Sequence, residues 1–259
     1  MAADRLSLVI PMYRSAATLI ALLQRLSATV PGSEVVFVDD ACPERSADHV
    51  AAINCHDLDI VIVRVVPNVG QQAAVQIGAL HATGNIFVVM DADLQDAPED
   101  IPVLVSNLCA TPNLDVVCAA RSGLYTSPIR QLTASGYRAV VTVLTRGKIP
   151  RDAGMFLAAR ADSLMRISTL GDPMAPLVPA LAVSGARIKA ITLRRHPRLD
   201  GTSSYTNSMR LRAALRGLAL VTPARSLMAR RHRARFVQLA PVVSVDRLAP
   251  HRFSTDYTS

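Results

Sequence analysis

The stretch IFVVMDADLQDAPE occupies residues 86–99 and joins an apolar run to a group of carboxylates. A short apolar run bounded by polar residues is typical of a buried β-strand. Asp91 and Asp93 follow this run without a gap. If the chain stays extended there, side chains two positions apart point the same way, so both carboxylates can face one divalent cation. The segment therefore predicts a strand that ends at a cation site with oxygen ligands.

Similar apolar runs alternate with helical patterns over the first 120 residues. Because the runs are nearly continuous in hydrophobicity, they are typical of parallel strands covered by helices on both faces. We expect an α/β fold with a Rossmann-like, doubly wound, mostly parallel sheet. Strands are predicted at 6–10, 34–38, 60–66, 86–90 and 115–120, and helices at 15–30, at 70–84 with Gly84 as its C-terminal cap, and from about Pro98.

The alternation becomes less regular after residue 120. The patterns there predict a long helix over about 128–146, strands over 155–159 and 187–195, and an amphipathic helix over 207–221. The tail from residue 236 has no clear pattern and is expected to be disordered. We therefore divide the chain into a main α/β domain, a basic helical extension and a tail, at residues 1–205, 206–235 and 236–259.

Carboxylates follow a second predicted strand, because 34–38 runs directly into Asp39 and Asp40. Ligands of doubly wound sheets bind beyond the carboxyl ends of the strands, which is where these acids fall. The alternative is structural: such acids also cap turns, and Asp40 could cap the helix that follows it. The Asp57-Leu58-Asp59 segment precedes its strand, so we expect it to be a loop feature.

Glycine-rich phosphate cradles are absent from the sequence. The first strand is followed by IPMYRSAATL (10–19) rather than by G-x-G-x-x-G, and no G-x-x-x-x-G-K-[ST] occurs. The four cysteines form no C-x-x-C pair, which argues against a zinc site. A phosphate ligand would therefore need a metal ion and arginines.

The arginines are concentrated in one part of the chain. Residues 194–235 contain eleven arginines and one acid, whereas the chain as a whole carries a net charge of +8. Such a stripe favours an anionic partner, namely phosphate, nucleic acid or an anionic membrane surface. The alternative is a solvated basic tail. No apolar run approaches the roughly 18 to 20 residues that span a bilayer, and the N-terminus lacks a signal-peptide pattern, so a cytoplasmic location is expected.

Four ordered blocks together resemble a known family. VIPMY (9–13), VVFVDDACPE (35–44), NVGQQAAVQIGALHATG (68–84) and VVMDADLQDAPE (88–99) resemble the nucleotide-binding half of family 2 glycosyltransferases of the GT-A fold. The similarity points to the dolichol- or polyprenyl-phosphate branch, since HPRLDGTSSY (196–205) is similar to its H-x-R-x-x-G-x-S-x-Y segment. The resemblance covers about residues 5–220.

The resemblance implies a role for particular residues on the donor side. Asp91, Ala92 and Asp93 would form the motif that holds Mg²⁺ or Mn²⁺ against a UDP- or GDP-linked sugar, with Gln95 near the sugar or the metal. Pro11 and Tyr13 would line the nucleotide pocket, Asp39 would accept a hydrogen bond from the nucleobase, and Asp40 would fix the ribose side. The loop over the nucleotide would be shaped by Asn68, Gly70 and Gln71.

Phosphate-binding roles fall on later residues by the same resemblance. Arg121 would meet phosphate, Arg130 and Ser135 would meet the phosphate of the acceptor, and Arg198 and Ser203 would close over the diphosphate. Arg130 could equally belong to a solvated helix face. A phosphate acceptor is already anionic, so no general base would be required, and direct attack would invert the anomeric configuration.

The sequence therefore predicts a metal-dependent inverting glycosyltransferase acting on a polyprenyl phosphate. A soluble acceptor is the alternative, favoured by the missing membrane spans and by Leu157 where relatives often carry arginine. Nucleic-acid binding through the arginine stripe is a remote alternative, because interleaved aromatic residues are lacking. The segment 207–235 is expected to lie on an anionic membrane at its cytoplasmic face, or else to pack on the catalytic domain with a charged outer face.

Overall fold

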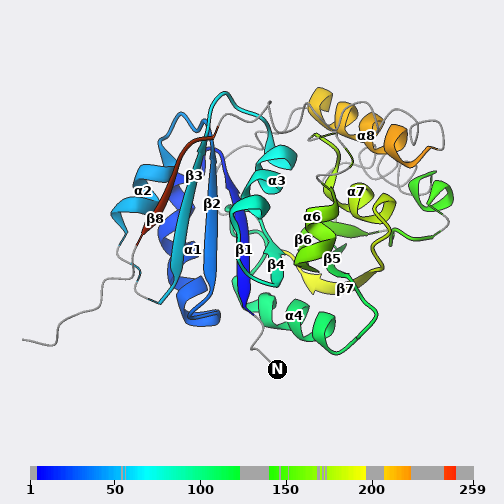
Figure 1. Cartoon of the computed structure of the whole chain (residues 1–259), viewed down its shortest axis with the longest axis horizontal. Coiled ribbons are helices and arrows are strands. Elements are labelled where there is room, and N and C mark those ends of the chain that lie inside the picture. The colour runs from blue at the N-terminus through cyan, green and yellow to red at the C-terminus, as the bar shows by residue number, and fades with distance from the viewer. Residues whose placement is uncertain are drawn as a thin grey trace, which may run out of the picture.

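The computed structural model describes residues 5–53, 55, 57–122, 140–145, 147–150, 152–167, 170, 172, 174–196, 207–222 and 242–248. Over these residues the chain forms an α/β fold around one eight-stranded sheet with the strand order β7-β5-β6-β4-β1-β2-β3-β8 (Figure 1). The strands are β1 (Leu6–Met12), β2 (Glu34–Asp40), β3 (Asp59–Val65), β4 (Ile86–Val89), β5 (Val116–Ser122), β6 (Ala153–Arg160), β7 (Ile188–Arg194) and β8 (Val242–Leu248).

The sheet is mostly parallel, as the sequence predicts. Strands β3, β2, β1 and β4 run parallel, and β5 runs parallel to β7. Strand β6 lies antiparallel between β4 and β5, and β8 lies antiparallel at the edge beside β3. The residues of β2 are all buried, which explains why this strand lacks an alternating pattern.

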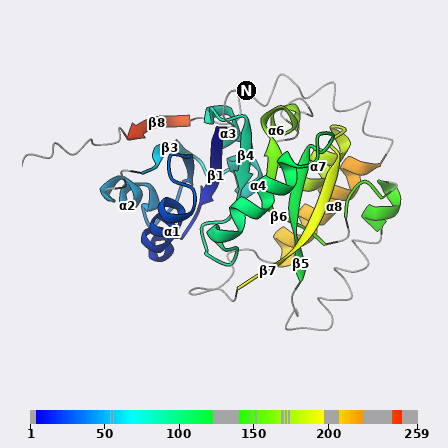
Figure 2. The same cartoon turned by 90° about the horizontal axis from the view of Figure 1, so that it is seen from below.

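Helices cover both faces of the sheet (Figures 1 and 2). The helices are α1 (Ala16–Thr29), α2 (Ser46–Ala52), α3 (Gln71–His81), η1 (Pro98–Asp100), α4 (Ile101–Cys109), α6 (Ala161–Ile167), α7 (Leu177–Val183) and α8 (Asn207–Val221). Apolar residues of α1, α2 and α4 pack in one core with alternate strand residues such as Leu8 and Ile10. Helices α3, α6 and α7 pack on the opposite face, where Val9 points.

The basic helix α8 packs on the outside of α7. Its Leu218 and Leu220 are partly buried against the core on the α3 side of the sheet. Its bounds, 207–221, are those that the helical pattern predicts. Of the helix predicted over about 128–146, only residues 140–145 lie among the described ones, and 140–144 are helical.

The predicted end of α3 is wrong, because the helix stops at His81 and not at Gly84. Gly84 instead allows its own backbone to lie close to the backbone of Arg5 and Ser7. Its N–H donates to Ser7 Oγ at 2.8 Å, and a Cβ at this position would lie 2.5 Å from the carbonyl oxygen of Arg5. Any larger residue would push α3 away from the start of β1.

The expectation of a disordered tail is wrong for residues 242–248. These residues form β8, which pairs with β3 from Ile60 to Val65. An edge strand depends on a distant partner for its hydrogen bonds, so its own sequence carries a weak signal. Because β8 belongs to the main sheet, this part of the tail is not separate from the α/β domain.

Candidate functional site

Acidic residues of two segments lie at the carboxyl ends of the central strands. Strand β1 lies between β2 and β4, and Met12 of β1 is in register with Asp39 of β2. Strand β4 leads through Met90 into Asp91. The central strands thus bring the two acid groups predicted from the sequence to one edge of the sheet.

The segment that carries Asp91 and Asp93 turns rather than continuing β4. Strand β4 ends at Val89, residues 92 and 93 form a turn, and Leu94 adopts a left-handed φ of +57°. The extended backbone that we expected at Asp91 and Asp93 is therefore wrong, and a turn arranges the two carboxylates instead. We call residues 91–96 the aspartate loop.

Separate elements hold the aspartate loop through hydrogen bonds. The side-chain amide of Gln71, the first residue of α3, donates to Asp91 Oδ1. Thr18 Oγ1 of α1 donates to the carbonyl oxygen of Ala92 at 2.6 Å. The backbone N–H of Gln95 donates to Asp93 Oδ1 at 3.1 Å. The carboxylates are half-buried and their orientation is fixed by the protein.

The donor set of this loop suits a hard divalent cation. Carboxylate oxygens are the preferred ligands of Mg²⁺ and Mn²⁺, and each ionised carboxylate offers about four lone-pair sites, so one hydrogen bond does not exhaust it. Asp93 also caps its own turn, which was the structural alternative for this residue. Within the described ranges, no group of three or more His, Cys, Asp or Glu residues could hold a metal.

Asp40 fixes the loop that precedes α3. Its carboxylate accepts hydrogen bonds from the backbone N–H groups of Val69 at 2.6 Å and Gly70 at 2.8 Å. Asn68 Nδ2 donates to the carbonyl oxygen of Asp40 at 2.8 Å. Gly70 has a φ of +84°, which suits glycine. Asp40 therefore holds the loop before α3 and does not cap the helix that follows it in sequence.

Burial raises the pKa of Asp40 above its ordinary value, and the neighbouring charge of Asp39 adds to this effect. The two backbone hydrogen bonds favour the ionised form and reduce the shift without cancelling it. The role on the ribose side that the resemblance implies for Asp40 stays a prediction.

Asp39 is buried and caps the turn and helix that follow β2. Its Oδ1 accepts from the N–H of Cys42 at 2.8 Å and its Oδ2 from the N–H of Ala47 at 3.3 Å. The structural alternative thus holds for this residue, and base recognition by Asp39 stays a prediction. At the end of β1, Pro11 is buried, and the half-exposed Tyr13 ring lies 5.6 Å from the guanidinium carbon of Arg14.

Five other predicted residues have side chains that the structure does not describe. Arg121 lies in β5, where its backbone is paired with Leu193 of β7. Arg130, Ser135, Arg198 and Ser203 lie outside the described residues. Their phosphate-binding roles stay predictions.

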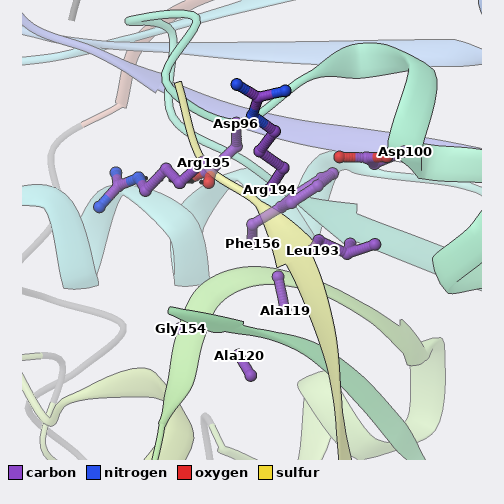
Figure 3. A pocket seen from close by; sticks show the side chains of 9 residues that line it. All are labelled: Asp96, Asp100, Ala119, Ala120, Gly154, Phe156, Leu193, Arg194 and Arg195. Atoms are coloured by element: carbon purple, nitrogen blue, oxygen red, sulfur yellow. Dashed lines mark ion pairs between the residues drawn. The ribbon is translucent and has the colours of Figure 1, made fainter. Parts of the chain in front are cut away.

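A pocket beside the aspartate loop was not predicted from the sequence (Figure 3). It lies between the loop and the ends of β5, β6 and β7, and is lined by Asp96, Asp100, Ala119, Ala120, Gly154, Phe156, Leu193, Arg194 and Arg195. Burial and the charge of Glu99 raise the pKa of Asp100, and His196 opposes them. The sequence signal for this pocket was the pair Asp96 and Asp100 in the run DADLQDAPED (91–100). The residues around them do not indicate that β7 lies beside them.

The family of the chain follows from its sequence. Residues 7–167 match the model of the family described as Glycosyl transferase family 2. The chain belongs to that family. It is similar to an undecaprenyl-phosphate 4-deoxy-4-formamido-L-arabinose transferase of Yersinia enterocolitica serotype O:8 / biotype 1B, with 32% identity over 209 residues that cover 78% of this chain and 63% of the relative. A protein of the same name from Yersinia pestis (strain Pestoides F) is 31% identical over 208 residues, with the same coverage. The chain thus spans less than two thirds of the length of these relatives.

Solved structures of low sequence identity share the fold. Glucosyl-3-phosphoglycerate synthase of Mycobacterium tuberculosis in complex with Mn²⁺, UDP and glucosyl-3-phosphoglycerate aligns with a TM-score of 0.63 at 17% identity, over 85% of this chain and 81% of that one. Its complex with Mg²⁺ and UDP aligns with a TM-score of 0.61 at 17% identity, over 85% and 80%. The GT-A fold and the family that the sequence predicted are confirmed. None of the helices that the structure describes is both long and apolar enough to cross a membrane.

Proposed function

We propose that this chain is a metal-dependent, inverting glycosyltransferase that moves a sugar from a nucleotide-sugar to a polyprenyl phosphate. The observation that carries the proposal is the placement of Asp91 and Asp93 beyond the carboxyl end of β4, with both carboxylates oriented by the protein. The name of the Yersinia relatives supports the acceptor, and the metal and UDP in the solved structures of this fold support the donor.

Asp91 and Asp93 would hold Mg²⁺ or Mn²⁺ against the diphosphate of the donor. A two-carboxylate set suits Mg²⁺, which commonly takes one or two carboxylates together with substrate phosphates and waters. The ion would supply positive charge to stabilise the departing diphosphate. Gln71 orients the first carboxylate and the backbone of Gln95 orients the second.

Transfer then requires no general base from the protein. An oxygen of the acceptor phosphate forms a bond to the anomeric carbon, while the bond from that carbon to the diphosphate breaks and its electron pair leaves with the nucleoside diphosphate. Direct displacement inverts the configuration. Arg121, Arg130, Ser135, Arg198 and Ser203 would bind the phosphate groups, and Pro11, Tyr13, Asp39, Asp40, Asn68 and Gly70 would shape the nucleotide pocket, with UDP or GDP as the nucleotide.

A soluble hydroxyl acceptor is the second candidate, and the apolar residue at position 157 favours it. Leu157, at the position where relatives often carry arginine, is fully buried between β4 and β5 and provides no phosphate contact.

Peripheral contact with the cytoplasmic face of an anionic membrane completes the proposal. On α8, Arg212, Leu215 and Arg216 are exposed at helical spacing, with 56% of Leu215 accessible. Near the end of α8 in both views lies the segment 140–144, where Val143 is 76% exposed (Figures 1 and 2). Exposed apolar residues beside arginines suit the surface of an anionic bilayer. Nucleic acid is not among the proposed partners.

The test is transfer by the purified chain from UDP- and GDP-linked sugars, with Mn²⁺ or Mg²⁺, to undecaprenyl phosphate or to a soluble acceptor. Asp93→Asn should reduce turnover about a hundredfold or more, since an interaction with the developing charge is lost. Asp59→Asn, in the Asp-x-Asp segment at the opposite edge of the sheet, is the matched control and should leave turnover unchanged. Wild-type turnover by Asp93→Asn would overturn the metal assignment.

A further inference from the structure

The end of β7 is joined to the aspartate loop at two adjacent positions. The backbone N–H of His196 donates to the carbonyl oxygen of Gln95 at 2.8 Å. Arg195 Nε lies 3.3 Å from Asp96 Oδ1, with 24% of the Arg195 side chain and 13% of the Asp96 side chain exposed. The two contacts bind consecutive residues of one segment to consecutive residues of the other, and Figure 3 draws the side chains of Arg195 and Asp96.

These contacts reach Asp93 through one peptide unit. The N–H of Gln95 donates to Asp93 Oδ1, and the carbonyl of the same residue accepts from His196. A shift of the β7 end relative to Gln95 would therefore change the position of the N–H that orients the Asp93 carboxylate. The link is short, because only Leu94 separates Asp93 from Gln95.

The loop needs external support because its own backbone is unfavourable. Leu94 has a φ of +57°, a region that residues with a Cβ rarely adopt. Thr18 holds the loop from the side of α1, at Ala92. Beyond Leu94, the end of β7 contacts both Gln95 and Asp96.

We propose that Arg195 and Asp96 are positioning residues that hold Asp93 in the orientation required to bind the metal. The inference rests on the proposed function, because it assigns Asp93 to the metal. Neither residue is assigned a contact with the substrate. The ion pair fixes the end of β7 against the loop, so that the Gln95 N–H stays directed at the Asp93 carboxylate.

The chemistry of the contact predicts which substitutions are tolerated. Arg195 Nε is buried and makes no hydrogen bond of good geometry with the described residues, so its contact with Asp96 is chiefly one of charge. Arg195→Lys keeps a cation within reach of Asp96 and should retain most of the function. Arg195→Met keeps the stem of the side chain but removes the charge.

The pair Arg187–Asp115 provides a matched control. It joins residues just before β7 and β5 at the opposite edge of the same part of the sheet, at 3.2 Å. Arg187→Met removes an arginine–aspartate contact of the same kind, far from the aspartate loop. A loss that is due to stability alone should therefore appear in both methionine variants.

The experiment measures two properties of the purified chain. The first is hydrogen exchange of residues 91–97 without metal or nucleotide, which should be faster in Arg195→Met and Asp96→Asn than in the wild type, in Arg195→Lys and in Arg187→Met. The second is the affinity for Mn²⁺ in the presence of UDP, measured by calorimetry. It should fall about tenfold in Arg195→Met, as is usual when a residue that orients a metal ligand is lost, and no further in Arg195→Met/Asp96→Asn.

The results separate this proposal from the proposed function. Unchanged exchange of residues 91–97 in Arg195→Met and in Asp96→Asn would overturn the positioning role, whatever the wild type binds. Equal Mn²⁺ affinity in Arg195→Met and Arg187→Met would also overturn it. So would a double variant whose loss of Mn²⁺ affinity is the product of the losses in the two single variants. Failure of the wild-type chain to bind UDP with Mn²⁺ would overturn the proposed function instead, and the exchange result would still stand.

Discussion

Gln71, at the start of α3, donates its side-chain amide to the carboxylate of Asp91, at the end of β4. The contact joins two segments that are 20 residues apart in sequence and that the resemblance treats as separate parts of the site. In the structure they act together, because the first residue of α3 orients the first carboxylate of the aspartate loop. Loss of a residue that orients a metal ligand typically lowers metal affinity by about 10- to 100-fold.

We expect Gln71→Met to weaken Mn²⁺ binding in the presence of UDP by about tenfold, because the methionine keeps the length of the side chain but cannot donate to Asp91. Calorimetry of the apo chain with Mn²⁺ and UDP measures the change. Gln24→Met, at an exposed glutamine of α1, is the control and should bind as the wild type does. Equal affinities in the two variants would show that Asp91 needs no partner on α3.

Asp40→Asn should destabilise the fold at its center rather than affect nucleotide binding alone. The asparagine offers one acceptor oxygen where Asp40 accepts from two N–H groups, so either Val69 or Gly70 loses its partner. A buried donor without a partner costs about 1–3 kcal/mol. Urea unfolding measures the loss, and hydrogen exchange should be faster over residues 68–71. Full stability of the variant would mean that these N–H groups find other acceptors.

The edge of the sheet at which the site lies could be predicted from the sequence. Runs such as Glu34–Val38 are apolar enough to be strands, and parallel strands place their carboxyl ends together, so Asp39 and Asp91 had to share an edge. What each carboxylate does could not be predicted in the same way. Asp39 and Asp40 look equivalent in sequence, yet one caps the segment after β2 and the other holds the loop before α3.

Contacts between segments that are distant in sequence determine the shape of the aspartate loop and the places of β6 and β8, which the sequence did not indicate. Thr18 reaches Ala92 from 74 residues away, and Arg195 reaches Asp96 from the end of β7. The turn after Asp91 depends on such contacts, because Leu94 would not adopt its φ by local preference. The antiparallel place of β6 between β4 and β5 and the pairing of β8 with β3 are likewise decided by packing.

Glu34 should make the stability of the chain depend on pH. Burial alone would raise the pKa of its carboxyl, but hydrogen bonds from Ser7 and Thr83 outweigh burial and hold the pKa below its ordinary value. A carboxyl with a lowered pKa stabilises the fold above its unfolded pKa of about 4.5 and loses this contribution as the pH falls through the folded pKa.

Glu34→Gln isolates this effect. The difference in the free energy of unfolding between the wild type and the variant should be constant from neutral pH to about pH 5.5 and should shrink below that. Urea titrations across the pH range measure it. A constant difference down to pH 3 would mean that the pKa of Glu34 is not lowered.

The outer face of α8 should bind anionic lipid in proportion to its arginines. Arg216→Gln should weaken the binding of the chain to vesicles with anionic lipid by about 1 kcal/mol, or about fivefold, because one cation near the surface is lost. Lys189→Gln removes the same charge from an exposed position on β7, on a different part of the molecule, and is the control. Sedimentation with vesicles at low and physiological salt measures both variants, and binding should weaken as salt rises.

Leu215→Ser distinguishes insertion from attraction by charge alone. If the exposed Leu215 enters the interface, binding should weaken even when salt has screened most of the charge, because apolar burial does not depend on ionic strength. If α8 is instead a packed helix with a solvated face, Leu215→Ser and Arg216→Gln should bind vesicles as Lys189→Gln does. That result would overturn the proposed membrane contact and favour the proposal of a soluble acceptor for this chain.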